Sequence, residues 1–217
     1  MLKFINKYFL IAMIVLSPVY ICYSGTDVKK IIKNVQNKYK KSKLIQIEFN
    51  EVSRFSLTGT TSEVYGTLII NDKQNFRLES EDQIMVNDGT TFWRYNKIEN
   101  QVLIDHAKKG DQELLPNHFL QDISKNYFSQ LLEETKIEGK KVYLIKLIPK
   151  PTNESFFTSI KIWIKDKSWE VDRILYMDYN ENETEFNIEK IVFDPQLNDA
   201  IFTFTTPEGS EIVDVRF

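Results

Sequence analysis

The spacing of the apolar residues changes several times along this chain, and each spacing predicts a different element. Between residues 28 and 39, apolar side chains recur every three or four positions, which predicts a helix with one apolar face, capped by Thr26 or Asp27. From Lys43 onward the spacing becomes two, which predicts short strands joined by Gly, Asp and Asn turns. These strands are predicted at residues 45–49, 64–70, 76–78, 101–104, 141–148, 158–164, 171–179, 185–193 and 201–205.

A second helical pattern follows Pro116. Its apolar residues lie at positions 119, 120, 123, 127, 128, 131 and 132, a spacing typical of a helix that covers a sheet. Residues 107–116 show no regular pattern and separate this helix from the strands before it. No internal repeat or linker is present, so we expect one mainly β domain, a long antiparallel sheet covered by two helical segments.

Residues 84–95 predict a β-hairpin around Asp88-Gly89, a pair that favours a two-residue type I′ turn. Such a turn places Met85 opposite Phe92. Paired residues share a face of the sheet, and successive residues alternate between its faces. One face then carries Ile84, Val86, Trp93 and Tyr95, and the other carries Gln83, Met85, Phe92 and Arg94.

The more apolar face of this hairpin has two interpretations. In the first it packs under the two helices as ordinary core, which is the commoner use of an apolar stripe. In the second the sheet curls enough to enclose a cavity, whose aliphatic and aromatic wall would suit an alkyl ligand. The pattern of residues alone leaves both open.

The N-terminal residues form a separate segment. A basic stretch precedes an apolar run at residues 8–20, and Ser24 supplies a small residue at a cleavage point, which is the pattern of a secretory signal peptide. The apolar run is short for a membrane span. We therefore expect residues 1–24 to be removed and residues 25–217 to form the mature domain, soluble outside the cytoplasm.

Charge and cysteine usage narrow the function of this domain. The chain has a formal net charge of −3. Removal of the N-terminal segment takes away lysines but no acids, so the mature domain lacks the basic surface that nucleic acid binding requires. Cys22 is the one cysteine and leaves with that segment. No disulfide, thiol nucleophile or thiolate metal site is then expected.

Residues that could carry out catalysis are sparse. His106 and His118 are the two histidines, and no nucleophile elbow, phosphate-binding loop, paired-histidine metal motif or calcium loop is present. The carboxylates are scattered through turns, as solvated acids usually are. We therefore expect no enzyme, no metal site and no cofactor.

Five short motifs follow one another along nearly the whole mature chain. They are FNE at 49–51, GTL at 66–68 with FR at 76–77, VNDGTTFWRYN at 86–96, LIPK at 147–150 and FTFTTPEG at 202–209. In the same order, these stretches resemble the LolA family of periplasmic carriers of outer-membrane lipoproteins. The hairpin sequence VNDGTTFWRYN resembles that family's segment of a hydrophobic residue, x-Asp-Gly-x-x, a second hydrophobic residue and Trp-x-Tyr.

The resemblance implies an open, incomplete antiparallel β-barrel closed by a helical lid, with an apolar cavity for acyl chains. It also implies partners: acylated lipoproteins as cargo, an inner-membrane ABC complex that loads the carrier and an outer-membrane LolB-like receptor that unloads it. We expect a monomer. The cavity residues are then Ile45, Ile47, Phe49, Leu68, Ile70, Phe76, Leu78, Ile84, Val86, Trp93 and Tyr95, and the lid residues are Val28, Ile31, Ile32, Val35, Phe119, Ile123, Phe128 and Leu131.

One turn departs from the family pattern. Many members carry an Arg-Pro pair in the turn before Phe76, where the arginine latches the lid, but here Asp72 occupies that position. Lys73 lacks the planar fork of arginine. We therefore expect the cavity but not the latch.

Two other functions fit the same residues. The first is a lipid-anchored receptor or lipid-binding lipoprotein of the same fold, held in a membrane through Cys22. The second is a secreted protein-interaction module that reuses the barrel. The residues before Cys22, Val-Tyr-Ile, are larger than a lipidation signal prefers, which favours the soluble carrier.

The first prediction concerns the N-terminus. We expect the native protein to begin near Gly25 and to carry no lipid, because Ser24 suits a signal peptidase. Intact mass of the protein purified from its own cells measures this. An acylated Cys22 as first residue would instead favour the anchored receptor.

Overall fold

The structure is a computed structural model that describes residues 27–73, 75–108, 115, 120, 122–153 and 155–217. The predicted signal peptide, with Cys22, lies outside the described residues, as do Phe119 and His118. The expectations that concern them are therefore not addressed by the fold.

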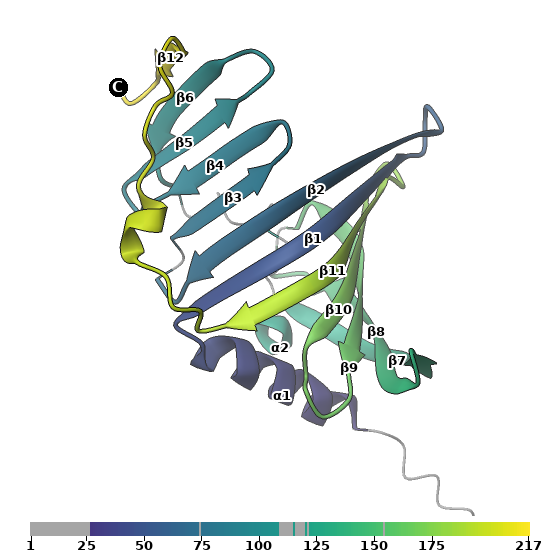
Figure 1. The fold of residues 1–217 in the computed structure, drawn as a ribbon. Coiled ribbons are helices and arrows are strands. Elements are labelled where there is room, and N and C mark those ends of the chain that lie inside the picture. The colour runs from purple at the N-terminus through teal and green to yellow at the C-terminus, as the bar shows by residue number, and fades with distance from the viewer. Residues whose placement is uncertain (1–26, 74, 109–114, 116–119, 121, 154) are drawn as a thin grey trace, which may run out of the picture.

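Twelve strands form one sheet whose order is β12-β6-β5-β4-β3-β2-β1-β11-β10-β9-β8-β7 (Figure 1). Its outer strands, β12 and β7, do not pair with each other, so the sheet is open, as predicted. All neighbours are antiparallel except β12 and β6. The elements are α1 (Val28–Lys41), β1 (Leu44–Phe55), β2 (Thr60–Asn71), β3 (Phe76–Ser80), β4 (Gln83–Asn87), β5 (Thr91–Asn96), β6 (Gln101–His106), α2 (Ile123–Asn126), β7 (Tyr127–Ile137), β8 (Lys140–Pro149), β9 (Phe157–Lys165), β10 (Val171–Asp178), β11 (Glu183–Phe193), η2 (Asp199–Phe202) and β12 (Glu211–Asp214).

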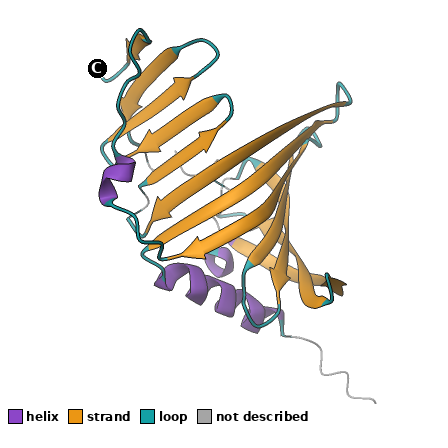
Figure 2. Cartoon of the chain, in the orientation of Figure 1, coloured by secondary structure: helices purple, strands orange, loops and turns teal. Residues whose placement is uncertain are grey.

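The sheet curls along its length, and helices α1 and α2 lie at one end of it (Figures 1 and 2). Strands β1 and β2 are twelve residues each and join a wing of short strands, β3 to β6, to the curled half formed by β11 to β7. The ladder between β1 and β11 shifts register between Glu48 and Phe49, a bulge that increases local bending. The concave side therefore needs a cover, and among the described residues α1 and α2 provide it at one end.

Helix α1 begins and packs as its sequence predicts. The Asp27 carboxylate accepts a hydrogen bond from the Lys29 backbone N–H at 3.0 Å, which caps the first turn. Its apolar stripe is buried in the core. Tyr39 lies at the end of this stripe, where its ring meets Phe193 edge-on at 5.5 Å and its hydroxyl accepts from the Val171 N–H at 3.2 Å. This one side chain fastens α1 to both β10 and β11.

The predicted second helix is wrong for most of its length. Among the described residues of this stretch, Leu120 has a 3-10 helical conformation and α2 is four residues long, and from Tyr127 onward the chain is strand β7. The exposure of Tyr127 to Leu132 alternates with a period of two, and the strand pairs with β8 along its whole length. The apolar spacing fitted both structures, and pairing with β8, a tertiary contact, decided between them.

The predicted hairpin forms, but its turn is longer than expected. Val86 pairs with Trp93 and Met85 with Arg94, a shift of two residues from the predicted register. In the turn, Gly89 has a positive φ of 89° and Asp88 does not, so the turn is not type I′. The Asp88 carboxylate instead accepts from the N–H groups of Thr90 and Thr91. Because the shift is two, each residue keeps its predicted set of face-sharing neighbours.

The predicted strand at residues 201–205 is also wrong. This segment contains η2 followed by extended chain that joins no ladder, and the last strand is β12, farther along. Phe204 lies against Trp93, with ring centroids 6.2 Å apart. Its apolar residues are therefore used for packing on the sheet and not for extending it.

The fold generates a prediction about Tyr39. Replacing Tyr39 with Phe leaves the Val171 N–H buried without its acceptor, which should lower the free energy of unfolding by roughly 1–3 kcal/mol near pH 7. Burial raises the pKa of Tyr39 well above its ordinary value. The native state therefore holds this proton after the unfolded chain has lost it, and wild-type stability should fall above about pH 10, whereas the Phe variant lacks this contribution.

Urea unfolding at both pH values measures the effect. Tyr179→Phe is the matched control, since Tyr179 is 74% exposed. An equal loss for Tyr39→Phe and Tyr179→Phe at neutral pH would contradict the anchoring role.

Candidate functional site

A cavity of 480 Å³ lies on the concave side of the sheet, between the wing of short strands and the curled half. This volume is within the range of small-molecule sites. Among the described residues, its wall comes from eight of the strands and from no helix. The lining residues are Phe49, Glu51, Val64, Leu78, Ser80, Gln83, Met85, Phe92, Arg94, Phe157, Tyr176, Thr184 and Phe186.

The ladder register explains why these side chains share one side. Leu78 pairs with Met85, and Met85 pairs with Arg94, so all three point the same way on neighbouring strands. Phe49 pairs with Gly66 on β2. A Cβ at Gly66 would lie 2.7 Å from the Cζ atom of Phe49, so glycine is needed to let this ring lie flat across β2.

Aromatic rings form the wall on the curled side. Phe49 and Phe186 meet edge-on with centroids 5.4 Å apart, and Tyr176 meets Phe186 edge-on at 6.0 Å. Phe157 lies 4.4 Å from Tyr176. Such contacts hold rings in fixed orientations. The cavity therefore has a rigid aromatic side, and burial also raises the pKa of Tyr176 well above its ordinary value, so its hydroxyl stays neutral.

Two charged residues reach this cavity. Glu51 is half-buried, and burial raises the pKa of its carboxyl, although the Ser53 hydroxyl donates to it at 3.2 Å and opposes the shift. Arg94 is exposed at the rim, its guanidinium carbon 5.1 Å from the centroid of the Phe92 ring. The site is thus an apolar interior with polar groups at its edge, which suits binding better than catalysis.

Of the predicted cavity residues, Phe49 and Leu78 line this cavity. Five others are on the concave side but are buried in the core cluster that includes the stripe of α1. They therefore act as ordinary core in this structure. These five are Ile45, Ile47, Leu68, Ile70 and Phe76.

The remaining four predicted cavity residues lie on the opposite, convex side of the sheet. They alternate with Met85, Phe92 and Arg94, which line the cavity, so they point away from it. Phe204, from the segment after η2, covers this side of the hairpin. Both faces of the hairpin are apolar because both are covered, and the richer face is the outer one. The four residues are Ile84, Val86, Trp93 and Tyr95.

The predicted lid residues that the structure describes lie partly on helices and partly on strand β7. The four from α1 and Ile123 of α2 pack into or against the core. Leu131 lies on β7 and packs against the core, whereas Phe128, also on β7, is 59% exposed. Leu115 and Leu120, which were not among the predicted lid residues, are fully buried in the same cluster. The four α1 residues are Val28, Ile31, Ile32 and Val35.

The turn that departs from the family pattern forms no latch with the described residues. Asp72 and Lys73 are both exposed, and neither forms an ion pair within the part of the chain that the structure describes. The Asn71 side chain organises the turn by accepting from the N–H groups of Lys73 and Asn75.

Sequence reasoning missed the aromatic side of the cavity. Phe157, Tyr176 and Phe186 lie on strands that were predicted, and their alternation with polar residues marked them as face-sharing sets. Which set faces the hairpin depends on how the sheet curls. That long-range geometry has no signal in the local pattern.

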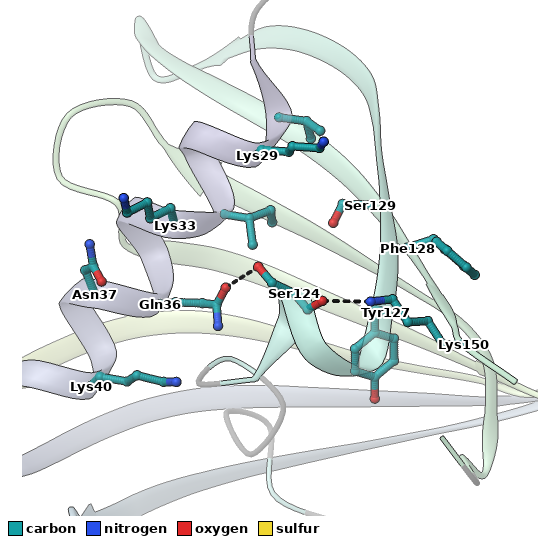
Figure 3. A pocket seen from close by; sticks show the side chains of 12 residues that line it. Lys29, Lys33, Gln36, Asn37, Lys40, Ser124, Tyr127, Phe128, Ser129 and Lys150 are labelled. Atoms are coloured by element: carbon teal, nitrogen blue, oxygen red, sulfur yellow. Dashed lines mark hydrogen bonds between the residues drawn. The ribbon is translucent and has the colours of Figure 1, made fainter. Parts of the chain in front are cut away.

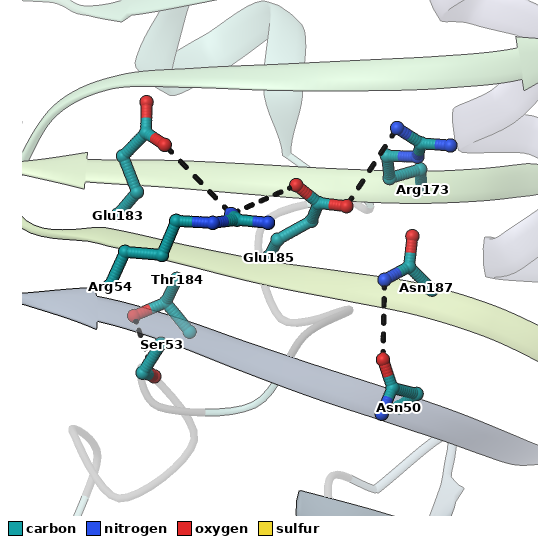
Figure 4. A network of polar contacts seen from close by, with 8 residues as sticks. All are labelled: Asn50, Ser53, Arg54, Arg173, Glu183, Thr184, Glu185 and Asn187. Carbon is teal, nitrogen blue, oxygen red and sulfur yellow. Dashed lines mark hydrogen bonds and ion pairs between the residues drawn. The ribbon is translucent and has the colours of Figure 1, made fainter. Parts of the chain in front are cut away.

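A polar network crosses β1, β11 and β10 next to the cavity (Figure 4). Arg54 is 3.2 Å from Glu185 and 3.9 Å from Glu183, and Arg173 is 3.7 Å from Glu185. These three strands are thereby joined on the convex side, away from the lining residues. The pairs are partly exposed, so each contributes little stability.

Side chains of the kinds that bind metal ions are dispersed in the described part of the chain. In that part, no three His, Cys, Asp or Glu side chains gather where they could hold a metal ion. His106 is exposed at the end of β6. Nor does any helix in the described part of the chain have the length and apolar character needed to cross a membrane.

Comparison with known proteins confirms the family resemblance. The family model described as outer membrane lipoprotein carrier protein LolA matches residues 40–205. An uncharacterized protein of Methanocaldococcus jannaschii, MJ0687, is 24% identical over 95% of this chain, which spans 60% of that relative's length. An outer-membrane lipoprotein carrier protein of Histophilus somni is 23% identical over 85% of this chain and 88% of its own.

A solved structure shares the fold. An uncharacterized conserved protein from Thermus thermophilus superposes with a TM-score of 0.57, covering 87% of this chain and 99% of that one, at 13% sequence identity. At this identity the likeness concerns the fold alone.

The cavity generates a prediction about Glu51. Because burial raises the native pKa of this carboxyl, its contribution to stability is present below the unfolded pKa and is lost as the pH rises through the native value. Glu51→Gln removes this titration. We expect the variant to be more stable than wild type near pH 7 and equal to it near pH 3, where both side chains are neutral.

Thermal or urea unfolding at both pH values measures this difference. Glu208→Gln serves as the control, because Glu208 is exposed in the C-terminal segment. A Glu51→Gln variant that is less stable at neutral pH would mean that the carboxylate is satisfied in the folded protein.

Proposed function

The chain belongs to the LolA family of outer membrane lipoprotein carrier proteins, and from this membership we propose that it is a carrier that binds the acyl chains of lipoproteins released from the inner membrane. It takes them to the outer membrane across the periplasm. The observation that carries the proposal is the 480 Å³ cavity with its aromatic wall, on the concave side of an open sheet. The family supports lipoprotein binding, and the transfer between membranes is our inference.

The physical chemistry of the cargo requires such a cavity. Each methylene removed from water is worth about 0.8 kcal/mol, so an acylated protein does not leave a bilayer unaided. Met85 and Phe157 are partly exposed in the wall and offer apolar surface that an acyl chain would contact directly. The polar rim at Glu51 and Arg94 keeps the opening wet and leaves room for the peptide that bears the acyl chains.

Release must be as easy as binding. The core side chains under α1 are close-packed, so deeper entry of an acyl chain would have to displace them and would weaken the apparent affinity. We propose that α1 is the fixed part of the lid, because Tyr39 holds it to two strands. A partner then has to supply only a small free energy to release the cargo from the carrier.

Loading and unloading belong to partners in this proposal. An inner-membrane ABC complex extracts the lipoprotein and passes it to the cavity, and an outer-membrane LolB-like receptor accepts it. The carrier itself is a soluble periplasmic protein without catalytic activity. The relative from Histophilus somni, which is called an outer-membrane lipoprotein carrier protein, supports this assignment.

A lipid-anchored protein of the same fold is the second candidate. It is favoured by one observation, that Cys22 lies directly after an apolar run and five residues before the cap of α1. The N-terminal mass described above separates the two. A secreted protein-interaction module would fit the fold as well, and it would bind its partner without acyl chains.

Crosslinking tests the carrier function. A photoreactive amino acid at Met85 or Phe92 should crosslink to lipoproteins in living cells, because these side chains line the cavity. The same probe at Val86 or Trp93, the neighbouring positions on the other side of the sheet, should not. Immunoblotting for a tagged lipoprotein after irradiation reads out the adduct.

A lipoprotein whose acylated cysteine is replaced by serine provides the control for acyl-chain binding. Adducts that form with this unacylated form would point to the interaction module. Adducts from positions 86 and 93 alone would mean that cargo binds the convex side.

A further inference from the structure

A second hollow lies between α1 and the beginning of β7, and it shares no lining residue with the cavity (Figure 3). Its volume is 560 Å³. Two bonds fix its floor: the Ser124 hydroxyl donates to the Gln36 side chain at 2.5 Å, and Lys150 donates to the Ser124 carbonyl at 2.8 Å. The lining residues are Val28, Lys29, Ile32, Lys33, Gln36, Asn37, Lys40, Ser124, Tyr127, Phe128, Ser129 and Lys150.

The charge around this hollow is positive although the chain as a whole is acidic. Helix α1 contains six lysines and no acidic residue. Lys38 pairs with Glu170 and Lys40 with Asp122, whereas Lys29 and Lys33 form no ion pair within the described residues. The hollow therefore presents exposed cationic groups, Lys29 and Lys33, that no described carboxylate pairs with.

Two of these lysines are placed against the preference of the helix itself. Lys29 and Lys30 are in the first turn of α1, where the helix dipole is positive and acidic residues are favoured. Local choices that oppose stability are found most often at functional sites. The lysines at this end of α1 thus favour the binding of an anionic ligand.

Apolar side chains next to these lysines narrow the kind of ligand. Phe128 projects from β7 on the side away from α1 and is 59% exposed, and the residue paired with it, Ile148, is 41% exposed (Figure 3). The Lys150 ammonium lies 5.6 Å from the centroid of the Phe128 ring. A free phosphate ion would gain no binding energy from exposed apolar side chains, whereas a bilayer surface offers phosphates with acyl chains beneath them.

We propose that the face formed by α1 and the start of β7 binds the surface of an anionic phospholipid bilayer. Lys29, Lys33 and Lys150 contact the lipid phosphates, and Phe128 and Ile148 enter the interface. This is an activity of the protein itself, without cargo or transporter, and it goes beyond the proposed carriage of lipoproteins. It would hold the protein transiently at the membrane where lipoproteins are collected or delivered.

Vesicle flotation with cargo-free protein, purified from cells, tests this proposal. Partition is measured onto vesicles of phosphatidylcholine alone and of phosphatidylcholine with phosphatidylglycerol, at low and high salt. The ratio of the two partition coefficients cancels any binding common to both, such as that of an N-terminal anchor. We expect a ratio well above one at low salt that falls toward one at high salt, because salt screens the lysines.

Matched variants locate the binding face. Each lysine near an anionic membrane surface strengthens binding by roughly fivefold, so Lys29→Gln with Lys33→Gln should lower the ratio by about 25-fold. The control is Lys136→Gln with Lys190→Gln, which has the same charge change at the far part of β7 and on β11. Phe128→Ser should weaken binding at both salt concentrations, because its contribution is apolar.

Three outcomes would overturn the proposal. They are a wild-type ratio of one at low salt, an equal drop for both pairs of lysine variants, and an unchanged ratio for Lys29→Gln with Lys33→Gln. Circular dichroism checks that each variant is folded. Loss of vesicle binding with normal crosslinking to lipoproteins would leave the carrier function intact, so the two proposals fail separately.

Discussion

The structure depends on the burial of one concave apolar surface by a helix that is too short to cover it. The twelve-stranded sheet curls, and the stripe of α1 packs into its closed end together with residues from β1, β2, β8 and β9. Tyr39 holds this arrangement by joining the helix to β10 and β11. Beyond the reach of α1, the same concave surface continues without contact to a helix of the described part of the chain, and there the cavity begins.

The other side of the sheet sets the character of that cavity. Phe204 covers Trp93 and Tyr95 on the convex side of the hairpin, so this part of the sheet has apolar residues on both faces. The hairpin is stabilised from outside, and its inner face is free to carry polar residues such as Gln83 and Arg94. An apolar cavity with a wet rim is the result, and it suits a ligand with a hydrocarbon part and a polar part.

Charged residues, like apolar ones, are distributed differently over the two sides of the sheet. The lysines of α1 gather at the closed end of the sheet, whereas the cross-strand ion pairs of Arg54 and Arg173 with Glu185 neutralise one another on the convex side. These cross-strand ion pairs join neighbouring strands and produce little net electrostatic potential. The unpaired lysines produce a local positive potential, which in an acidic protein is a directional signal to an anionic surface.

The sequence by itself determined the elements whose signals are local. These are the cap and stripe of α1, most of the strands, the antiparallel meander and the presence of a hairpin at Asp88-Gly89. Alternation also assigned each hairpin residue to the correct face-sharing set, because side chains alternate whatever the register. The family motifs were in the sequence too, and they implied the open barrel that the structure contains.

Only the tertiary structure decided which face of the hairpin is inside, because that depends on Phe204, more than a hundred residues away. The same holds for β7, whose spacing suited a helix until β8 supplied hydrogen-bond partners, and for the aromatic wall from β9 to β11. Local backbone geometry sets which face of a strand a side chain is on, whereas segments distant in sequence decide what packs over that face. The periodicity of the sequence therefore predicts the face and contains no information about the packing partner.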